Sequence, residues 1–337
     1  MILLIIIIVI IILIAIPLII YWLSRLASTT EVSVVKYGII GDGKTDWSTK
    51  LNNIISQTNN RLTLFFSKGV YIINGTVTIN KPYITFKGEQ GSIIKKGTQS
   101  SILISSNYCT LSNLVIDGNK QGYANIFVTG SYNKILYVTS ILSGAQGIGL
   151  DGGHLDTNNA CSFAPVSTCR FNLVQYCNIS NNGGVGISQY NINNNLIINN
   201  TVFNNSLEGI TVDVNSNYTK ITDNQIINNC LVGGVGGIGM DNASYNVISS
   251  NIISLTQSSL SGIKTQNNCG TCNNNLIDNN IIINNTGYGV WLYYNPVSNL
   301  GSYNNTISNN IILNNNGTSI QIDSQNTDNT VKNNFTR

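Results

Sequence analysis

An asparagine-rich phrase, N-x-I-x-x-N in its fullest form, recurs through the second half of this chain and constrains the fold more than any other feature. Successive copies are separated by 24, 27, 29, 30 and 24 residues, and they start at Asn195, Thr219, Asn246, Asn275, Asn305 and Asn329. A recurrence of this length is typical of chains that stack one supersecondary unit on the next. We therefore expect a solenoid.

The repeated unit is expected to consist of short strands. Segments such as LIINNTVFNN are β-branched, are broken by Asn, and keep no apolar stripe long enough for a helix. A second phrase, G-I-x-V-D in one copy, follows the first in every unit and starts at Gly147, Gly186, Gly209, Gly237, Gly262, Gly289 and Ser319. Two or three short strands per turn indicate an all-β fold, one coil of a parallel β-helix in each unit.

The asparagine that closes each phrase stands where the chain must turn between strands. Asn tolerates the left-handed backbone of sharp turns better than other residues that carry a side chain. In stacked coils these residues would form one column whose side-chain amides hydrogen-bond along the stack. The predicted ladder contains Asn200, Asn224, Asn251, Asn280, Asn310 and Asn334.

The second phrase predicts an outward-facing surface. Because alternate residues of a strand point to opposite sides, the third and fifth residues of the phrase should face solvent. The fifth positions are Asp151, Tyr190, Asp213, Asp241, Gln266, Tyr293 and Asp323, and the third positions are Gly149, Ser188, Thr211, Gly239, Lys264, Trp291 and Gln321. Neighbouring strands lie about 4.8 Å apart, so Asp213 and Asp241 should have adjacent carboxylates, with Lys264 one coil further on.

Three interpretations of this cluster stay open. Paired carboxylates about 5 Å apart can act as acid and nucleophile in glycoside hydrolysis, and wider pairs suit inversion through water. Alternatively, Asp213 and Asp241 hold Ca²⁺ against a uronic acid while Lys264 removes the C5 proton, as a lyase or epimerase requires. The third interpretation is that Asp ends these strands only because Asp favours turns. The candidate sugar-binding residues on the same surface are Tyr190, Gln266, Trp291 and Tyr293.

The first residues are of a different kind. Ile2 to Leu23 is an apolar run interrupted only by Pro17 and ending in Tyr21 and Trp22, which suits a transmembrane helix. A cleaved signal sequence is the alternative, but no basic residue precedes the run. The predicted organisation is an anchor or signal at 1–23, a linker at 24–33 and a β-helix at 34–337.

Composition limits the partners and the compartment. Charged residues make up 9% of the chain and the formal net charge is +3, so nucleic acid is excluded as an expected partner. Seven cysteines are present, including two close pairs in predicted loops, Cys161 with Cys169 and Cys269 with Cys272. Disulfides within these loops would fit an oxidising environment, outside the cell or on a virion surface.

The segment from Val34 to Asp46 carries a more specific signal. Its sequence, VVKYGIIGDGKTD, resembles the opening motif of pectate-lyase-like β-helix proteins through Tyr37, Gly38, Gly41, Asp42, Gly43, Thr45 and Asp46. The resemblance implies a right-handed parallel β-helix with an N-terminal capping helix near 46–58. Asp46 is suited to cap that helix, and Leu51, Ile54 and Ile55 would form its apolar side.

Two looser resemblances concern chemistry. The chain is similar to polygalacturonases in Asp213, Asp241 and Gly262 to Thr265, although Gly262 stands where the family has Arg and no His lies between. The phrase LDGGHLD, with Asp151 and His154, faintly resembles the D-P-H of alginate C5-epimerases. These residues imply an active centre without fixing a reaction.

We therefore expect a membrane-anchored extracellular β-helix protein that binds a polysaccharide or cell-surface glycan. An enzyme that cleaves or epimerises the bound glycan is one form of this hypothesis. The alternative is a non-catalytic spike, adhesin or virion surface protein, because tailspikes share the fold. No cap follows the last repeat phrase, so we also expect another copy, in a homotrimer or dimer, to cover the last coil.

Overall fold

The computed structural model describes residues 30–59, 61–153, 161–164 and 168–337. The predicted anchor at 1–23 lies outside this range, and so does most of the predicted linker. The last four linker residues, Thr30–Ser33, instead form strand β1, which pairs in parallel with β3. No helix among the described residues is long and apolar enough to cross a membrane.

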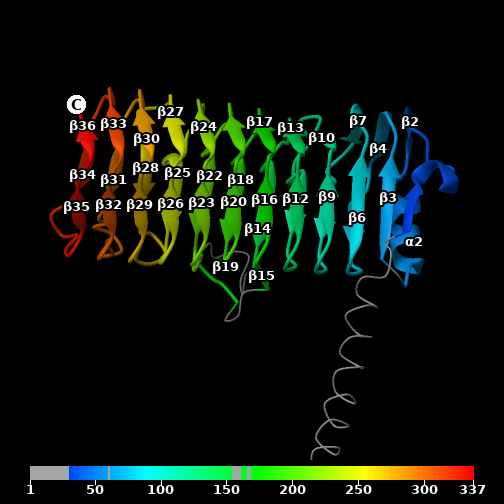
Figure 1. Ribbon diagram of the computed structural model, residues 1–337, viewed down its shortest axis with the longest axis horizontal. Coiled ribbons are helices and arrows are strands. Elements are labelled where there is room, and N and C mark those ends of the chain that lie inside the picture. Colours follow the sequence, from blue (N-terminus) through cyan, green and yellow to red (C-terminus); the bar gives the residue numbers. More distant parts are fainter. Residues whose placement is uncertain (1–29, 60, 154–160, 165–167) are drawn as a thin grey trace, which may run out of the picture.

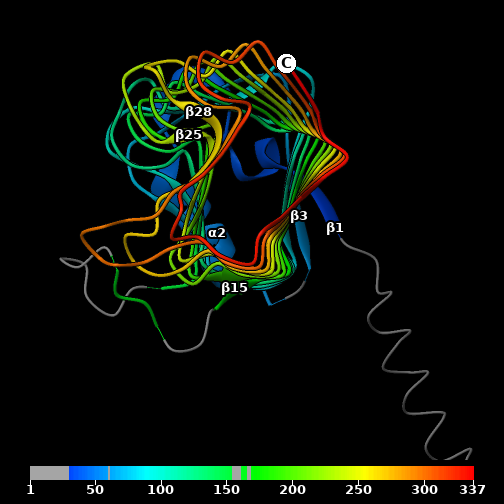
Figure 2. The same cartoon turned by 90° about the vertical axis from the view of Figure 1, so that its left-hand side faces the viewer.

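The chain winds into three long parallel sheets that form the sides of a solenoid (Figures 1 and 2). The first sheet contains β1 (Thr30–Ser33), β3 (Leu62–Phe66), β6 (Ile84–Gly88), β9 (Thr110–Ser112), β12 (Lys134–Leu136), β16 (Leu173–Gln175), β20 (Leu196–Ile198), β23 (Lys220–Thr222), β26 (Val247–Ser249), β29 (Leu276–Asp278), β32 (Thr306–Ser308) and β35 (Thr330–Lys332). The second contains β2 (Asp42–Asp46), β4 (Gly69–Ile73), β7 (Ser92–Lys96), β10 (Val115–Asp117), β13 (Thr139–Ile141), β17 (Asn178–Ser180), β21 (Thr201–Phe203), β24 (Gln225–Ile227), β27 (Ile252–Ser254), β30 (Ile281–Ile283), β33 (Ile311–Leu313) and β36 (Phe335–Thr336).

The third sheet is built mainly by the second phrase of each repeat. It contains β5 (Val77–Ile79), β8 (Ile102–Ile104), β11 (Ile126–Val128), β14 (Ile148–Asp151), β18 (Ile187–Tyr190), β22 (Ile210–Asp213), β25 (Gly236–Asp241), β28 (Ser261–Thr265), β31 (Val290–Leu292) and β34 (Ile320–Ile322). A separate pair joins β15 (Cys169–Arg170) to β19 (Ile192–Asn193). The predicted parallel β-solenoid is therefore confirmed.

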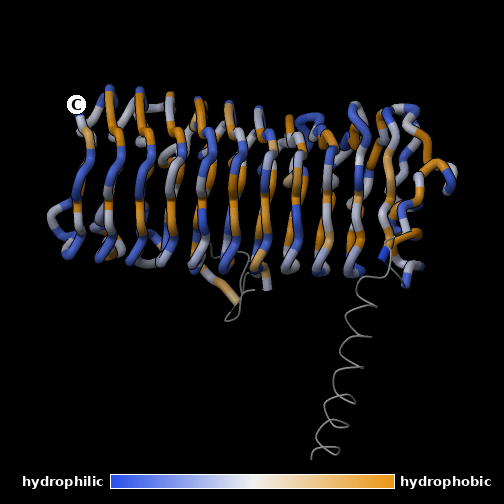
Figure 3. Tube along the Cα trace, viewed as in Figure 1, coloured by the Kyte–Doolittle hydropathy of each residue, from blue (hydrophilic) through white to orange (hydrophobic). Residues whose placement is uncertain are grey.

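The core follows from strand alternation. In the three-residue strands of the first sheet, the middle residue points inward, and Ile197, Ile221, Ile248 and Ile277 are at most 1% exposed. Each is paired with the next along the sheet, so identical side chains stack from coil to coil. Figure 3 shows the result as hydrophobic and hydrophilic segments alternating along each coil.

The asparagine ladder is present in the structure. Along the predicted column, each side-chain Nδ2 donates to Oδ1 of the next asparagine at 2.9–3.0 Å, and the same Oδ1 accepts the backbone N–H. Two further columns, which the sequence analysis missed, occupy the other corners. One runs through Asn246, Asn275, Asn305 and Asn329, and the other includes Asn205 with Asn229 and Asn285 with Asn315.

The position of the left-handed turn was predicted one residue too late. Positive φ falls on the residue before each ladder asparagine, as at Asn199 (56°), Ser250 (56°) and Asn279 (55°). The left-handed residue turns the chain, and the next residue can then point its amide inward. Its pairing along the stack, not its own backbone, explains why Asn occupies the ladder position.

One α-helix lies at the N-terminal end of the stack in Figure 1. Helix α2 spans Ser48–Gln57, inside the predicted range, and follows a short 3-10 helix at Val34–Tyr37. Leu51 and Ile55 are fully buried and belong to the core. The N-cap position is held by Trp47 and not by Asp46, but Asp46 Oδ1 still accepts the amide N–H of Ser48 at 3.0 Å.

Candidate functional site

The predicted register of the third sheet is observed. Asp213 is paired directly with Asp241, and Tyr190 is paired with Asp213 on the other side. The alternating residues Ile210 and Val212 are fully buried, so the aspartates belong to the outward-facing set. The structure therefore brings the two predicted carboxyls together on neighbouring strands.

Both carboxyl groups have a raised pKa. Burial raises the pKa of Asp213 well above its usual value, and the nearby charges of Glu208 and Asp241 raise it further, while the Thr211 hydroxyl partly offsets the rise. Asp241 is only 6% exposed, and burial raises its pKa against the hydrogen bonds that it accepts from Cys269 and Asn268. The larger rise at Asp213 favours its protonated form at pH values where Asp241 is already ionised.

Glu208 is a third carboxyl that the sequence analysis missed. It is 8% exposed, and its Oε1 accepts the amide N–H of Val235 at 2.8 Å. Burial raises its pKa. A side chain at Gly239 would approach Val235 to 2.7 Å and Glu208 to 3.3 Å, so this glycine leaves the space that both side chains occupy. The available signal was its place directly before Gly209 in the second phrase.

Lys264 lies one strand beyond Asp241, as predicted, between Gly239 and Trp291. Its Nζ is 4.0 Å from the Trp291 ring centroid and 4.8 Å from that of Tyr293. Burial lowers the pKa of Lys264, and Asp323 partly opposes this effect. The two predicted stacking rings therefore already pack against a cation.

Trp291 and Tyr293 are also held by their neighbours. Trp291 Nε1 donates to Asp323 Oδ1 at 3.0 Å, and the two rings meet edge to face with centroids 5.2 Å apart. Tyr288 also packs against Trp291, with ring centroids 4.8 Å apart. The rings are thus fixed in place before any ligand arrives.

The remaining predicted residues have separate roles. The hydroxyl of Tyr190 donates to the carbonyl oxygen of Ser162, so this ring is tied to the loop after β14. Asp151 Oδ1 accepts the backbone N–H of Gly153 at 2.7 Å. Gln266 is half-buried, and its backbone N–H donates to the carbonyl oxygen of Met240. His154 lies outside the described residues.

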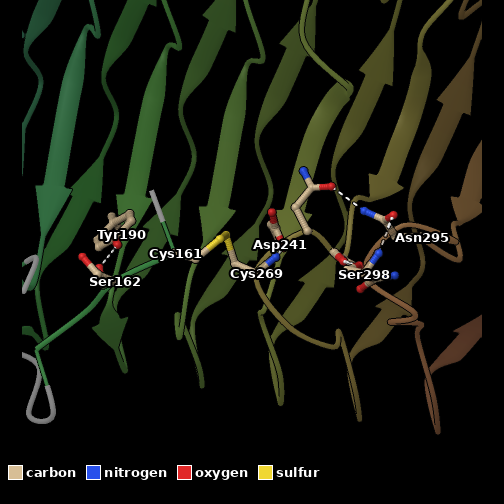
Figure 4. The surroundings of a disulfide bond; sticks show 9 residues. Cys161, Ser162, Tyr190, Asp241, Cys269, Asn295 and Ser298 are labelled. Atoms are coloured by element: carbon tan, nitrogen blue, oxygen red, sulfur yellow. Dashed lines mark hydrogen bonds between the residues drawn. A yellow bond between two sulfur atoms is a disulfide. The ribbon is translucent and has the colours of Figure 1, made fainter. Parts of the chain in front are cut away.

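A disulfide lies beside Asp241 of the carboxyl pair (Figure 4). The close cysteine pairs are not bonded within themselves, because Cys161 is bonded to Cys269, 108 residues away. The bond joins the loop after β14 to the loop after β28, beside the strands that carry Tyr190, Asp213 and Asp241. The Cys269 amide donates to Asp241 Oδ1 at 2.9 Å. The other cysteines are buried thiols, namely Cys109, Cys169, Cys177, Cys230 and Cys272.

The predicted calcium site at Asp213 and Asp241 is not supported by the side chains around it. Among the residues that the structure describes, no three His, Cys, Asp or Glu side chains are grouped so that they could hold a metal ion. Asp213 and Asp241 instead lie in surroundings that favour their protonated forms. We therefore derive no step through a metal.

Sequence comparison places this solenoid in a known family. Residues 31–252 match the family model described as rhamnogalacturonase A/epimerase, pectate lyase-like, and residues 227–336 match the right-handed β-helix region. The chain belongs to the pectate lyase-like β-helix family, as its opening motif predicted. No curated protein matches the chain by sequence.

Solved structures share the fold at low sequence identity. ORF18 of Geobacillus virus E2 is 17% identical to this chain and superposes with a TM-score of 0.61. The match covers 96% of this chain but only 63% of the viral protein. The mannuronan C-5 epimerase AlgE4 A-module of Azotobacter vinelandii is 14% identical, with a TM-score of 0.54 and coverage of 91% and 97%. PfbA, a surface adhesin of Streptococcus pneumoniae, is 14% identical, with a TM-score of 0.60 and coverage of 91% and 93%. These likenesses establish the fold alone.

Proposed function

We propose that the protein binds a polysaccharide along the outward face of the third sheet and hydrolyses a glycosidic bond at Asp213 and Asp241. The observation that carries this proposal is the in-register pair of carboxyl groups, both with a raised pKa. Glycoside hydrolysis needs one protonated and one ionised carboxyl at the same bond. Two neighbouring carboxyls whose pKa values are raised to different degrees can supply both forms at one pH.

The roles follow from the environment of each carboxyl. Asp213 lies nearer the repelling charge of Glu208 and acts as the acid, giving its proton to the leaving glycosidic oxygen. Asp241 acts as the nucleophile: its carboxylate bonds to the anomeric carbon as the glycosidic C–O bond breaks, and water then cleaves the resulting ester while the Asp213 carboxylate takes the proton of that water. Glu208 does not touch the substrate in this scheme, and it positions the proton on Asp213.

The lyase or epimerase alternative has weaker support. It needs a free base and a positive group that neutralises the uronate carboxylate. Lys264 is the predicted base, and burial lowers its pKa as a base requires, but its Nζ is packed on the rings of Trp291 and Tyr293. A neutral sugar is easier to place beside Asp213 and Asp241 than a uronate.

A polysaccharide screen tests hydrolysis directly. Neutral and uronic-acid polysaccharides are incubated with the protein, with reducing ends and the absorbance of unsaturated ends both recorded, with and without Ca²⁺. We expect reducing ends without unsaturated ends, and at least a hundredfold loss in Asp213→Asn and in Asp241→Asn. Asp223→Asn, at an exposed corner of the first sheet, is the matched control and should keep full activity. Unsaturated ends that vanish in Lys264→Met would instead establish the lyase.

A non-catalytic surface role is the second candidate. It is favoured by the likeness to the adhesin PfbA, 93% of which is covered, and by the pre-packed rings at Trp291 and Tyr293. On this reading the solenoid is a rigid rod on a cell or virion that carries a glycan receptor site. Retained glycan binding without any product in the screen would support it over hydrolysis.

We also propose where the protein is located, what covers the first coil and how the chain assembles. The apolar run at 2–23 supports a membrane anchor, and the disulfide supports an extracellular body. Helix α2 is proposed to cap the N-terminal coil through Leu51 and Ile55. A second copy is proposed to cover the outermost strands β34, β35 and β36, where Phe335 is 64% exposed. Cell fractionation with protease protection tests the anchor, and light scattering of residues 30–337 tests the assembly.

A further inference from the structure

A pocket of about 490 Å³ opens on the third sheet at β8 and β11, away from the carboxyl pair. Its walls include Gln99, Leu103, Tyr123, Phe127 and Gln146. A cavity of this size lies within the range that holds small ligands. Neither of the two catalytic schemes uses it.

One rim of the pocket is built rigidly. Lys96 is completely buried, and its Nζ donates to the carbonyl oxygens of Gly122 at 3.1 Å and Tyr123 at 3.0 Å. Ser101 Oγ donates to the Ala124 carbonyl at 2.6 Å. Three hydrogen bonds from the side chains of Lys96 and Ser101 thus hold the segment that carries Tyr123, so the pocket is formed before a ligand binds.

The lining has the chemistry of a neutral sugar site. The side chains are uncharged, and the rings of Tyr123 and Phe127 and the side chain of Leu103 offer apolar surface. The amides of Gln99 and Gln146 can donate and accept hydrogen bonds at the edge of the pocket. A sugar ring presents an apolar CH face and a polar rim of hydroxyls, which these two kinds of group complement.

The pocket is aligned with the carboxyl pair. Phe127 and Leu103 are paired on adjacent strands, and the same outward column continues from Phe127 through Gly149 and Ser188. Thr211 and Gly239 extend it to the strands of Asp213 and Asp241. Between Phe127 and Lys264 only Ser188 of this column is partly exposed, because Phe127 lies against Gly149, Thr211 is 4% exposed, and Val235 and Glu208 fill the space over Gly239. Phe127 is three strands from Thr211, a separation of about 14 Å.

We infer that the pocket is a distal subsite for a neutral sugar residue of the same chain whose glycosidic bond lies at Asp213 and Asp241. The position of the reacting bond in this inference rests on the proposed function, whereas sugar binding in the pocket does not. The bound chain lies parallel to the solenoid axis and passes Ser188 on its way from the pocket to the carboxyl pair. A chain must then have roughly four or more hexose units to fill both places, given the spacing of the strands.

The test is a binding measurement on an array of neutral hexose oligosaccharides of two to eight residues, using residues 30–337 with the disulfide intact. We expect affinity for at least one series to rise tenfold or more once the chain is long enough to reach the pocket. Phe127→Ala and Gln146→Ala should remove this step and leave binding of the shortest bound members unchanged. Phe203→Ala, an outward and half-buried Phe on the second sheet, is the matched control and should keep the step.

The outcomes separate the subsite from the proposed chemistry. Absence of binding to every neutral series, a smooth length dependence, or a step that survives Phe127→Ala would each overturn the inference. Asp241→Asn should keep the length step in binding even though it abolishes hydrolysis. A retained step in a protein that yields no product would uphold the subsite and reject the hydrolase.

Discussion

Asp241 accepts the amide hydrogen of Cys269 at 2.9 Å, so a single hydrogen bond links the carboxyl pair to the Cys161–Cys269 disulfide. The disulfide therefore holds a loop against the centre as well as stabilising the body. We predict that Cys161→Ser, which leaves Cys269 in place, lowers the unfolding free energy by about 2–4 kcal/mol, mainly because the unfolded chain is no longer cross-linked.

Urea unfolding with and without dithiothreitol checks this prediction. Reduction should lower the wild-type midpoint to that of Cys161→Ser and should leave the variant unchanged. The variant is thus its own control for effects of the reductant on the buried thiols. Equal midpoints for Cys161→Ser and the oxidised wild type would contradict the prediction.

Asp213 should make the protein less stable as the pH rises. Its pKa in the folded state lies well above the ordinary Asp value of 3.8, so the folded protein holds a proton that the unfolded chain has released. Stability is therefore lost from about pH 4 upward, through the folded pKa. Asp213→Asn removes this loss, so the variant should be more stable than wild type at pH 7, by on the order of 1 kcal/mol for each unit of the shift, and no more stable at pH 3.5.

Chemical unfolding of both proteins at pH 3.5 and pH 7 provides the measurement. A stability difference that does not change between these pH values would show that Asp213 titrates normally. The same raised pKa also predicts that hydrolysis declines on the alkaline side as the acid form of Asp213 is lost.

Asn251 should be among the positions least tolerant of substitution. It is completely buried, and its Oδ1 accepts both the backbone N–H and Nδ2 of Asn224, while its Nδ2 donates to Ile221 and Asn280. Asn251→Ala leaves buried donors and an acceptor unpaired, at about 1–3 kcal/mol each, so a total loss of about 3–5 kcal/mol is expected.

Thermal or urea unfolding monitored by circular dichroism checks the value, with Asn316→Ala as control. Asn316 is exposed, so that change should stay within about 0.5 kcal/mol. Asn251→Asp keeps the shape but loses the donors, and it should be destabilising as well. Tolerance of Asn251→Asp would mean that the donated hydrogen bonds contribute little.

The sequence predicted the features that depend on the repeat spacing and on the alternation of residues along a strand. The spacing of the Asn phrases located Asn251 over Asn280, and strand alternation then placed Asp213 beside Asp241 and Lys264 one strand further on. Features created by loops were not predictable in this way. Glu208 is bonded to Val235, a residue of the loop before β25, and Cys161 meets Cys269 only after four coils have stacked.

Stacked aromatic rings at one corner of the solenoid lead to the last prediction. Tyr83, Tyr108, Tyr132 and Phe171 form a column with ring centroids 4.9–5.1 Å apart, and each has a positive φ of 57–62°. Bulky residues rarely adopt this backbone, which Asn accepts more readily, by up to about 1 kcal/mol. Tyr132→Asn relieves the backbone but loses two stacked contacts, worth about 0.5–1.5 kcal/mol each, plus buried ring surface.

The loss should exceed the relief, so Tyr132→Asn is expected to destabilise the protein by about 1 kcal/mol. Tyr123→Asn is the matched control, since Tyr123 has φ of 66° and is 63% exposed, without a stacked ring among the described residues. It should be neutral or slightly stabilising, because only the backbone effect remains. If urea midpoints of the two variants shift in the same direction and by the same amount, the stacked column contributes nothing to stability.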